Sequence, residues 1–273
     1  MPNVSEGRDP EVIDACARAI AETGARLAHR TSDAIHNRSV FTYFGERDAV
    51  IAAAVALARV TTERIDLRRH AGAHPRIGAL DVLPFVPFGD ATMDDAIAVA
   101  HDAAQRIWEA TRVPSFLYGA AATREEFRAL PAVRSGGFEG LPGRRSSGLR
   151  PDVGDDVAHA SAGAIAVGAR AVLVAFNVVL SSADVHLARR IARRLRESGG
   201  GLKTVRALGI ALGNGRVQVS CNVTDAQAVP LDRVLSLVRR AAARAGVEVV
   251  GTELIGLVPR SALAAVVRRR LAF

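Results

Sequence analysis

Lysine is almost absent from this sequence. Of its 36 basic side chains only Lys203 is a lysine, and the remainder are arginines. We attribute this bias first to genome composition and second to the use of guanidinium groups for anion binding. Cysteine is rare too: Cys16 and Cys221 stand far apart, without CxxC or zinc-ligand spacing, which favours a reducing, cytoplasmic setting. We expect both cysteines to be small buried apolar residues.

Apolar runs long enough to cross a membrane are missing as well. The charge-free stretches 157–169 and 171–183 are separated by Arg170, and each is shorter than the ~18 apolar residues of a membrane span. The polar start Met1-Pro2-Asn3 does not read as a signal peptide. The sequence also lacks a phosphate loop, a dinucleotide fingerprint and a nucleophile elbow. We therefore expect a soluble protein with no membrane partner and no nucleotide-driven chemistry.

Acidic residues are few in the last two-fifths of the chain. Residues 1–169 hold 19 basic and 22 acidic side chains, whereas residues 170–273 hold 17 and 6, giving formal net charges of −3 and +11. This asymmetry indicates an anionic partner, which could be a nucleic acid, a membrane or an acidic metabolite. No aromatic residues interleave the arginine-rich stretches to stack on bases, so a nucleic acid is disfavoured.

Hydrophobic residues make up 49% of the chain, enough for a substantial core. Apolar periodicity and capping residues predict helices, and alternating or continuous apolar runs predict strands. We expect helices from Asp9-Pro10 to about Leu27, over 46–66, 92–111, 184–198 and 230–244, and from Ser261 onward. We expect strands over 40–44, 81–86, 171–180, 205–212, 216–223 and 247–257.

The order of these elements predicts an α/β fold in two halves. The second half is a strand-helix-strand-strand-helix-strand unit, and the first half looks like a weaker version of it. Residues 136–163 concentrate glycine, proline, serine and charge, so we interpret them as a long bridging loop. Prolines in the strand over 81–86 place it away from the centre of its sheet. In the strand 216–223 one face is apolar and the other polar, which fits either solvent exposure or a ligand channel.

Histidine offers the main candidates for chemistry. His70 and His74 have a spacing that could bind zinc on a helix, but Gly72 and Pro75 would break that helix and no glutamate stands between the histidines. His74 alone lies in a constrained loop beside Arg76, where a neutral imidazole could accept and return a proton. A histidine satisfied by the backbone in a turn is the other interpretation. Asn37-Arg38 fits either carboxylate binding or an ordinary surface salt bridge.

A set of separated motifs resembles one family, the glutamate formimidoyltransferase domain. The matches run in order, with near-constant spacing, over essentially the whole chain. They are Pro2-Asn3-Val4-Ser5-Glu6-Gly7, Asn37-Arg38, His74-Pro75-Arg76-Ile77-Gly78-Ala79-Leu80-Asp81-Val82, Val167-Gly168-Ala169-Arg170, Ala175-Phe176-Asn177, Gln218-Val219-Ser220 and Leu254-Ile255-Gly256-Leu257-Val258-Pro259.

The resemblance implies two subdomains, residues 1–169 and 170–273, each a mixed β-sheet with helices on its outer face. The two sheets would face each other across a charged ligand tunnel, in a cytoplasmic homodimer. It further implies transfer of a formimino group from N-formimino-L-glutamate to tetrahydrofolate in histidine degradation, without a metal. The cyclodeaminase domain that is fused to some family members has no match in these residues. The basic second half would then suit an acidic folate, especially one with a polyglutamate tail.

The resemblance also assigns site residues. The catalytic histidine falls on His74, and we expect Asn37, Arg38 and Arg76 to bind the formiminoglutamate. The folate-binding positions fall on Gly154, Asp155, Asp156, Val157, Ala158, His159, Ala160, Ser161, Ala162, Gly163 and Gly200.

Two charges of the family pattern are missing beside His74. Ala71 and Ala73 stand where the family has a lysine and a glutamate. A nearby carboxylate would stabilise an amidinium, so another acid, such as Asp81, would have to replace that glutamate. The alternative function is therefore a folate-binding paralogue with a different one-carbon donor or without catalytic activity.

Overall fold

The computed structural model describes residues 1–144 and 148–271, and the chain divides into two units, residues 1–171 and 172–273. Each unit has its own sheet and its own hydrophobic core. Within the described residues no helix is both long and apolar enough to cross a membrane.

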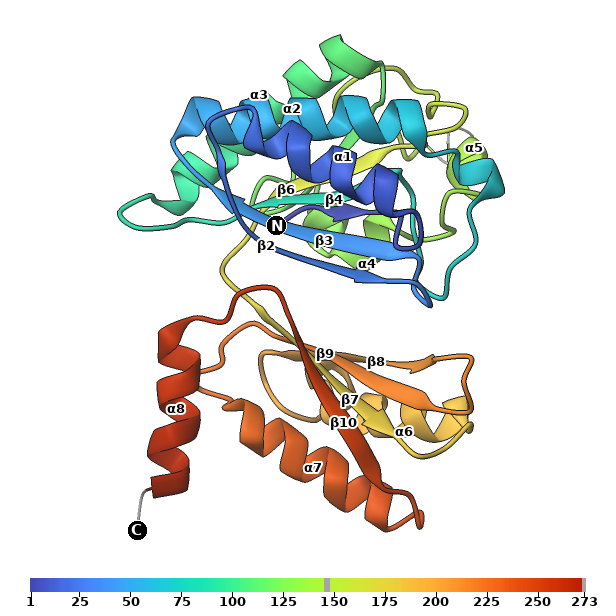
Figure 1. Cartoon of the computed structure of the whole chain (residues 1–273), viewed down its shortest axis with the longest axis vertical. Helices are drawn as coiled ribbons and strands as arrows, with labels where there is room; N and C mark the ends of the chain where they lie inside the picture. Colours follow the sequence, from blue (N-terminus) through green and yellow to red (C-terminus); the bar gives the residue numbers. More distant parts are fainter. Residues whose placement is uncertain (145–147, 272–273) are drawn as a thin grey trace. The chain divides into compact units, whose positions relative to one another are not determined.

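The first unit contains a six-stranded mixed sheet in the order β2-β3-β1-β4-β6-β5 (Figure 1). Strands β4, β6 and β5 run parallel, and the other neighbouring pairs are antiparallel. The strands are β1 (Asn3–Val4), β2 (Arg26–Asp33), β3 (Arg38–Phe44), β4 (Leu80–Phe85), β5 (Ser115–Gly119) and β6 (Ile165–Ala169). The helices are α1 (Pro10–Ala21), α2 (Arg47–Arg64), α3 (Met93–Thr111), α4 (Leu130–Val133) and α5 (Leu141–Arg144), with short 3-10 helices η1 (Leu67–Arg69) and η2 (Glu125–Arg128).

The two faces of this sheet are covered differently. Helices α1, α2 and α3 pack on one face and bury the main core around Phe41, Leu57 and Ile107 (Figure 1). On the other face, η2, α4 and α5 cover only the parallel strands, with Phe116 and Phe127 in edge-to-face contact. The rest of that face, over β2, β3 and β1, carries polar side chains, and it is the part that holds the candidate site.

Local sequence sets the ends of the helices. Asp9 caps α1 through its carboxylate, with Pro10 at the first helical position, and Thr92 and Asp95 form a capping box on α3. The prediction that the first helix reaches Leu27 was wrong. The helix ends at Ala21, because Gly24 turns the chain with a φ of 83° and β2 then begins at Arg26.

Strand β4 was predicted away from the centre of its sheet, and this was also wrong: β4 lies between β1 and β6. Pro84 is tolerated there because β1 is only two residues long. The register pairs Asn3 with Val82, so Pro84 lies beyond the end of β1. The missing N–H of Pro84 therefore has no strand partner to lose, while its carbonyl accepts a 3.4 Å hydrogen bond from the Met1 amino group.

The second unit has four strands in the order β10-β7-β9-β8, with α6 and α7 packed on one face (Figure 1). The expectation of a mixed sheet was wrong here, because all three pairings are antiparallel. Strand β9 lies between β7 and β8, which separates the two strands that the α6 connection makes parallel. The elements are β7 (Val174–Leu180), α6 (Val185–Leu195), η3 (Glu197–Gly199), β8 (Val205–Ala211), β9 (Val217–Val223), α7 (Leu231–Ala243), β10 (Val249–Ile255) and α8 (Arg260–Leu271).

Both units contain the same β-α-β-β-α-β arrangement, which the sequence predicted for the second half and, as a weaker version, for the first. Elements β1 to β4 with α1 and α2 repeat the order of β7 to β10 with α6 and α7, and the strands are arranged identically in the two sheets. The first unit then adds α3, β5 and β6. The prediction that the loop over 136–163 bridges the two halves was wrong, because β6, which follows it, belongs to the sheet of the first unit. The segment contains the short helix α5 and a series of turns, and its residues 145–147 lie outside the described part of the chain.

Candidate active site

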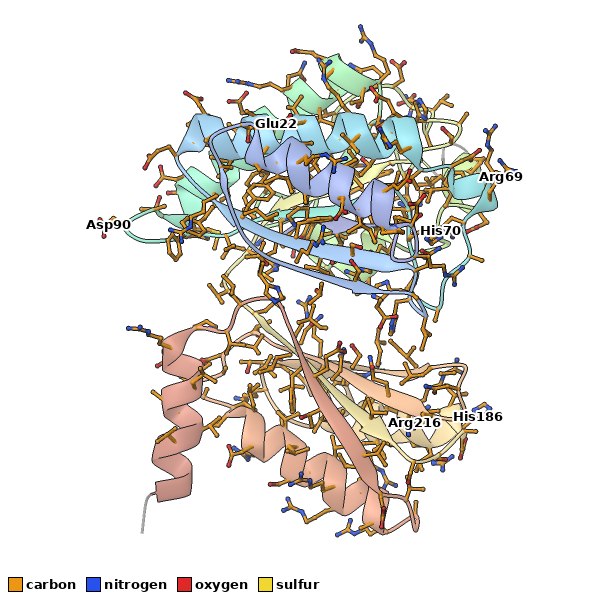
Figure 2. The ribbon with its side chains drawn as sticks, viewed as in Figure 1. Glu22, Arg69, His70, Asp90, His186 and Arg216 are labelled. Carbon is orange, nitrogen blue, oxygen red and sulfur yellow. The ribbon has the colours of Figure 1, made fainter. Side chains whose placement is uncertain are left out.

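His74 lies in the segment that leads from η1 to β4. Figure 2 labels Arg69 and His70, where this segment begins. This segment crosses the β2–β3 turn at very short range. A Cβ atom on Gly72 would lie 2.3 Å from the carbonyl oxygen of His36, so only glycine fits. Asn37 holds the crossing: its Nδ2 donates to the Ala71 carbonyl (3.1 Å), and its Oδ1 accepts from the Gly7 backbone N–H (2.9 Å).

The hydrogen bonds of His74 define its tautomer. Its Nδ1 lies 2.8 Å from the Pro75 carbonyl oxygen, which can only accept, so Nδ1 carries the hydrogen. Its Nε2 lies 2.5 Å from Nη1 of Arg38, which can only donate, so Nε2 presents its lone pair. Burial, together with the charges of Arg38 and Arg134, holds the pKa of His74 well below its usual value. The imidazole is therefore a neutral base at physiological pH.

Arg38 is placed by β3 on the polar face of the sheet. Its Nη2 donates to Oδ1 of Asn3 on β1. Burial lowers the pKa of Arg38 to about 10, and the neighbouring Arg134 adds to this effect. Asp33 is the cross-strand partner of Arg38, but its carboxylate lies 2.8 Å from Nδ1 of His36 instead. Arg38 thus has no ion pair within the described residues.

Arg76, the second residue predicted to bind a substrate carboxylate, already has partners within the protein. Its guanidinium donates to Nδ1 of His70 (3.0 Å) and to the carbonyls of Leu67 and His70, and it forms a 2.9 Å ion pair with Glu139. His70 in turn donates from Nε2 to the Asn37 carbonyl (3.0 Å). All ring nitrogens of His70 and His74 therefore have partners other than a metal. The contacts assign Arg76 a structural role, and its binding of substrate stays a prediction.

Asp81 does not supply the carboxylate that is missing beside His74. The residue is only 2% exposed. Its Oδ1 accepts from the Ile77 backbone N–H (2.8 Å), and its Oδ2 pairs with Nη2 of Arg134. Sequence reasoning did not find Arg134, because it lies 53 positions from its partner in a stretch without a recognisable motif. Because Arg134 neutralises Asp81, the positive charge beside His74 comes from Arg38, which suits an anionic substrate.

The loop 154–163 reaches the same segment. The Ala162 carbonyl accepts from the Ala79 backbone N–H, and the Ala164 N–H donates to the Ile77 carbonyl, at 2.9 and 3.0 Å. Gly163, with a φ of 73°, lies so close that a Cβ atom would be 2.1 Å from the oxygen of Ile77. The fold thus brings part of the predicted folate-binding loop against the residues that follow His74.

Three polar atoms on the face of the sheet that carries Arg38 have no hydrogen-bond partner in the described structure, although they are shielded from solvent. They are Nδ1 of His29, Oγ1 of Thr31 and Oγ1 of Thr42. Register places His29 beside Thr42 and Thr31 beside Val40, on the face of the sheet that carries Arg38. Buried polar atoms without partners are costly, so this face is chemically suited to a polar ligand such as a pterin or an amidine.

Comparison with known proteins identifies the family. Residues 1–170 match the formiminotransferase domain, N-terminal subdomain, and residues 175–269 match the formiminotransferase domain. This chain belongs to the formiminotransferase family. The resemblance seen in the sequence motifs is thereby confirmed.

Relatives in this family include single-activity and bifunctional proteins. The chain is 42% identical to glutamate formimidoyltransferase of Streptococcus pyogenes serotype M1, over 96% of this chain and 89% of the relative. It is 37% identical to the Thermoplasma acidophilum glutamate formimidoyltransferase, over 96% and 88% of the two chains. It is 41% identical to formimidoyltransferase-cyclodeaminase of Gallus gallus, over 96% of this chain but 50% of the relative.

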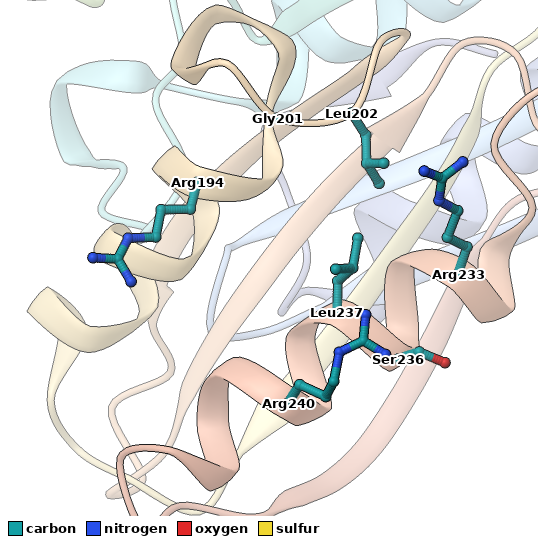
Figure 3. A pocket seen from close by; sticks show the side chains of 7 residues that line it. All are labelled: Arg194, Gly201, Leu202, Arg233, Ser236, Leu237 and Arg240. Carbon is teal, nitrogen blue, oxygen red and sulfur yellow. The ribbon is translucent and has the colours of Figure 1, made fainter.

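Gly200, the remaining predicted folate contact, lies in the second unit of this formiminotransferase. It follows η3 with a φ of 79°, and no atom lies within 4 Å of the position a Cβ atom would take. Beside it, a cavity of about 330 Å³ opens between α6, α7 and the turn after η3 (Figure 3). Leu202 and Leu237 contribute apolar surface, and Arg194, Arg233 and Arg240 surround it without an acidic partner among the described residues.

Proposed function

We propose that this protein transfers the formimino group of N-formimino-L-glutamate to tetrahydrofolate, with His74 as the general base and acid. The observation that carries the proposal is the state of His74: a neutral imidazole whose Nδ1–H is held by the Pro75 carbonyl and whose Nε2 presents a lone pair. Membership of the formiminotransferase family supports the choice of substrates.

The proton transfers follow from this tautomer. The reduced pterin supplies an attacking amine; its nitrogen bonds to the amidine carbon, and the bond from that carbon to the glutamate nitrogen breaks. His74 accepts at Nε2 the proton that the amine loses, and returns it to the glutamate nitrogen as that group leaves. The Pro75 carbonyl stabilises the intermediate imidazolium through Nδ1–H and keeps the ring oriented. One proton is thus moved between the two substrates, with no net gain or loss.

The charges around His74 suit the proposed donor. Formiminoglutamate carries two carboxylates, and Arg38 is a buried cation without an ion pair among the described residues, so we assign it to one of them. Asn37 positions the loop through its two backbone contacts. We assign the folate to the polar face of the sheet, with loop 154–163 and Gly200 as further contacts.

One observation favours the alternative function. Ala71 and Ala73 leave His74 without a neighbouring acid of its own segment, and Asp81 is bound by Arg134. A different one-carbon donor, or folate binding without turnover, would require no carboxylate to stabilise an amidinium at this position.

The deciding experiment mixes the purified protein with formiminoglutamate and tetrahydrofolate and follows formation of the formimino-folate and of free glutamate by mass spectrometry. We expect turnover, and a loss of about 10²–10⁴-fold in kcat for His74→Gln. His186→Gln, which alters an exposed histidine of the second unit, is the matched control and should keep full activity. Tetrahydrofolate binding without any turnover would support the paralogue, and absence of both would refute both functions.

Assembly and location are proposals of the same kind. The family resemblance leads us to propose a cytoplasmic homodimer in which the two units of each chain form a ligand tunnel. Light scattering at several protein concentrations tests the dimer directly, since a constant monomer mass would contradict it.

A further inference from the structure

The guanidinium of Arg38 is hydrogen-bonded to the ring nitrogen through which His74 would act as a base. The only lone pair of the His74 ring, on Nε2, accepts a hydrogen bond from Nη1 of Arg38 at 2.5 Å. Nε2 is the atom that must take a proton if His74 acts as the base. A lone pair engaged by a guanidinium cannot accept that proton, so the base is silent in this arrangement.

Arg38 itself lacks the partner that a buried guanidinium needs. Its Nη2 contacts the neutral amide of Asn3, and its Nε is shielded from solvent without a hydrogen-bond partner. The acid opposite to it, Asp33, is bound to His36 and to backbone N–H groups. The Asp81 carboxylate favours the charged form of Arg38 through space, but it pairs with Arg134 and makes no ion pair with Arg38. A buried cation without a direct ion pair is costly, and a carboxylate with bidentate geometry would stabilise it far better than an imidazole does.

We propose that Arg38 is a substrate-released latch on His74: it caps Nε2 in the unliganded protein and leaves Nε2 when a substrate carboxylate takes over the guanidinium. The proposal rests on the proposed role of His74 as the base. It couples donor binding to activation of the base, so His74 becomes competent only when an anionic donor is present.

The other charged groups that face His74 do not take this role. Arg134, which follows α4, is held by Asp81 in an ion pair. His36, in the β2–β3 turn, has its ring centre 6.2 Å from that of His74 and pairs with Asp33. Arg38, Arg134 and His36 each disfavour a proton on His74. Among them, only Arg38 both contacts the imidazole and has no ion pair with a described residue.

Nitrogen NMR of the protein labelled with ¹⁵N-histidine tests the latch without turnover. The His74 signals are assigned by their loss in His74→Asn. In the free protein we expect the Nδ1–H tautomer with Nε2 shifted by its hydrogen bond. Adding L-glutamate, the probe for the donor's carboxylates, should move Nε2 to the shift of an uncapped lone pair. An Nε2 signal that does not move at any concentration of L-glutamate would overturn the proposal.

Substitution of Arg38 gives the complementary measurement. Arg38→Gln should show the uncapped Nε2 shift without any ligand, and it should raise the pKa of His74, because the charge of Arg38 helps to hold that pKa low. Arg30→Gln is the matched control: Arg30 lies on the same hairpin, pairs with Asp14 and has Phe41, a residue of the opposite face, as its register partner. That control should leave both the Nε2 shift and the pKa of His74 as in the wild type. The same Nε2 shift in Arg38→Gln and wild type would contradict a cap.

Kinetics separate the latch from a purely structural role and from failure of the proposed function. Arg38→Gln should raise KM for formiminoglutamate at least about tenfold and move the acidic limb of kcat/KM to higher pH, with partial rescue by Arg38→Lys. A variant that only loosens the fold would lower kcat without moving the limb. If formiminoglutamate is not turned over while L-glutamate uncaps Nε2, the donor assignment fails and the latch stands.

Discussion

Asp81 and Arg134 form a buried ion pair that contacts the segment following His74. The Asp81 side chain is 3% exposed and that of Arg134 is 12% exposed, and the same carboxylate also fixes the Ile77 backbone N–H at 2.8 Å. The pair joins the start of β4 to the residues after α4, and thereby holds the chain that leads out of His74.

Replacing Asp81 by alanine should destabilise the protein strongly. The change leaves the guanidinium of Arg134 buried without its anion and the Ile77 N–H without its acceptor. We expect a loss of about 3–5 kcal/mol in the free energy of unfolding, measured by urea denaturation. The double variant Asp81→Leu/Arg134→Leu removes both charges and should lose less than the sum of the two single variants. Additive losses would show that the two side chains do not interact.

The low pKa of His74 sets two pH profiles. Since the base acts in its neutral form, kcat/KM should stay level as the pH falls through about 6.5, the usual pKa of histidine, and decline only at lower pH. The folded protein also binds a proton at His74 less readily than the unfolded chain does. The free energy of unfolding should therefore be fully present above pH ~6.5 and decrease below it, by at most about 1.4 kcal/mol per pH unit for one proton. His74→Asn should reduce this slope, and His70, whose pKa is lowered too, should supply the rest. An acidic limb centred at 6.5 or above would contradict the buried neutral base.

Both cysteines should resist alkylation in the native protein. Burial raises the pKa of the Cys16 and Cys221 thiols to about 12, so almost no thiolate exists at pH 8. We expect iodoacetamide to label neither residue in buffer and both in concentrated urea, as counted by mass spectrometry. Rapid labelling of native protein at pH 8 would show that one of the two sites opens to solvent.

Sequence patterns predicted the helices and strands that are determined by residues within the segment itself. Helices α2 and α3 and strands β8 and β9 appear within a few residues of their expected bounds, because the apolar spacing that defines each of them lies within the segment itself. Strand β2 was not predicted. It is an edge strand whose residues are exposed or half-buried in alternation, so it carries no apolar signal. The interior place of β4 was missed because it depends on the length of β1, a distant element.

In the candidate site, too, local motifs identified residues, whereas their partners depend on the tertiary fold. The motifs around His74, Asn37 and Arg38 pointed to residues that the fold does bring together. What those motifs could not show is which partner each side chain takes. Arg76 pairs with Glu139 and Asp81 with Arg134, over separations of 63 and 53 residues. Such pairings arise from tertiary packing, and no spacing within a motif encodes them.

Gly163 offers the sharpest test of the contact between the predicted folate loop and the His74 segment. Gly163→Ala adds a methyl group 2.1 Å from the Ile77 oxygen, on a residue with a φ of 73°. Gly89→Ala is the matched control, since Gly89 has a φ of 63° but open space around its Cβ position. The control should cost only the left-handed backbone, about 1–2 kcal/mol by urea denaturation, whereas Gly163→Ala should cost about 1–3 kcal/mol more. Because the clash displaces Ile77, three residues after His74, Gly163→Ala should also weaken tetrahydrofolate binding by calorimetry, which Gly89→Ala should not. Equal stability and equal folate affinity of the two variants would show that the loop does not depend on this contact.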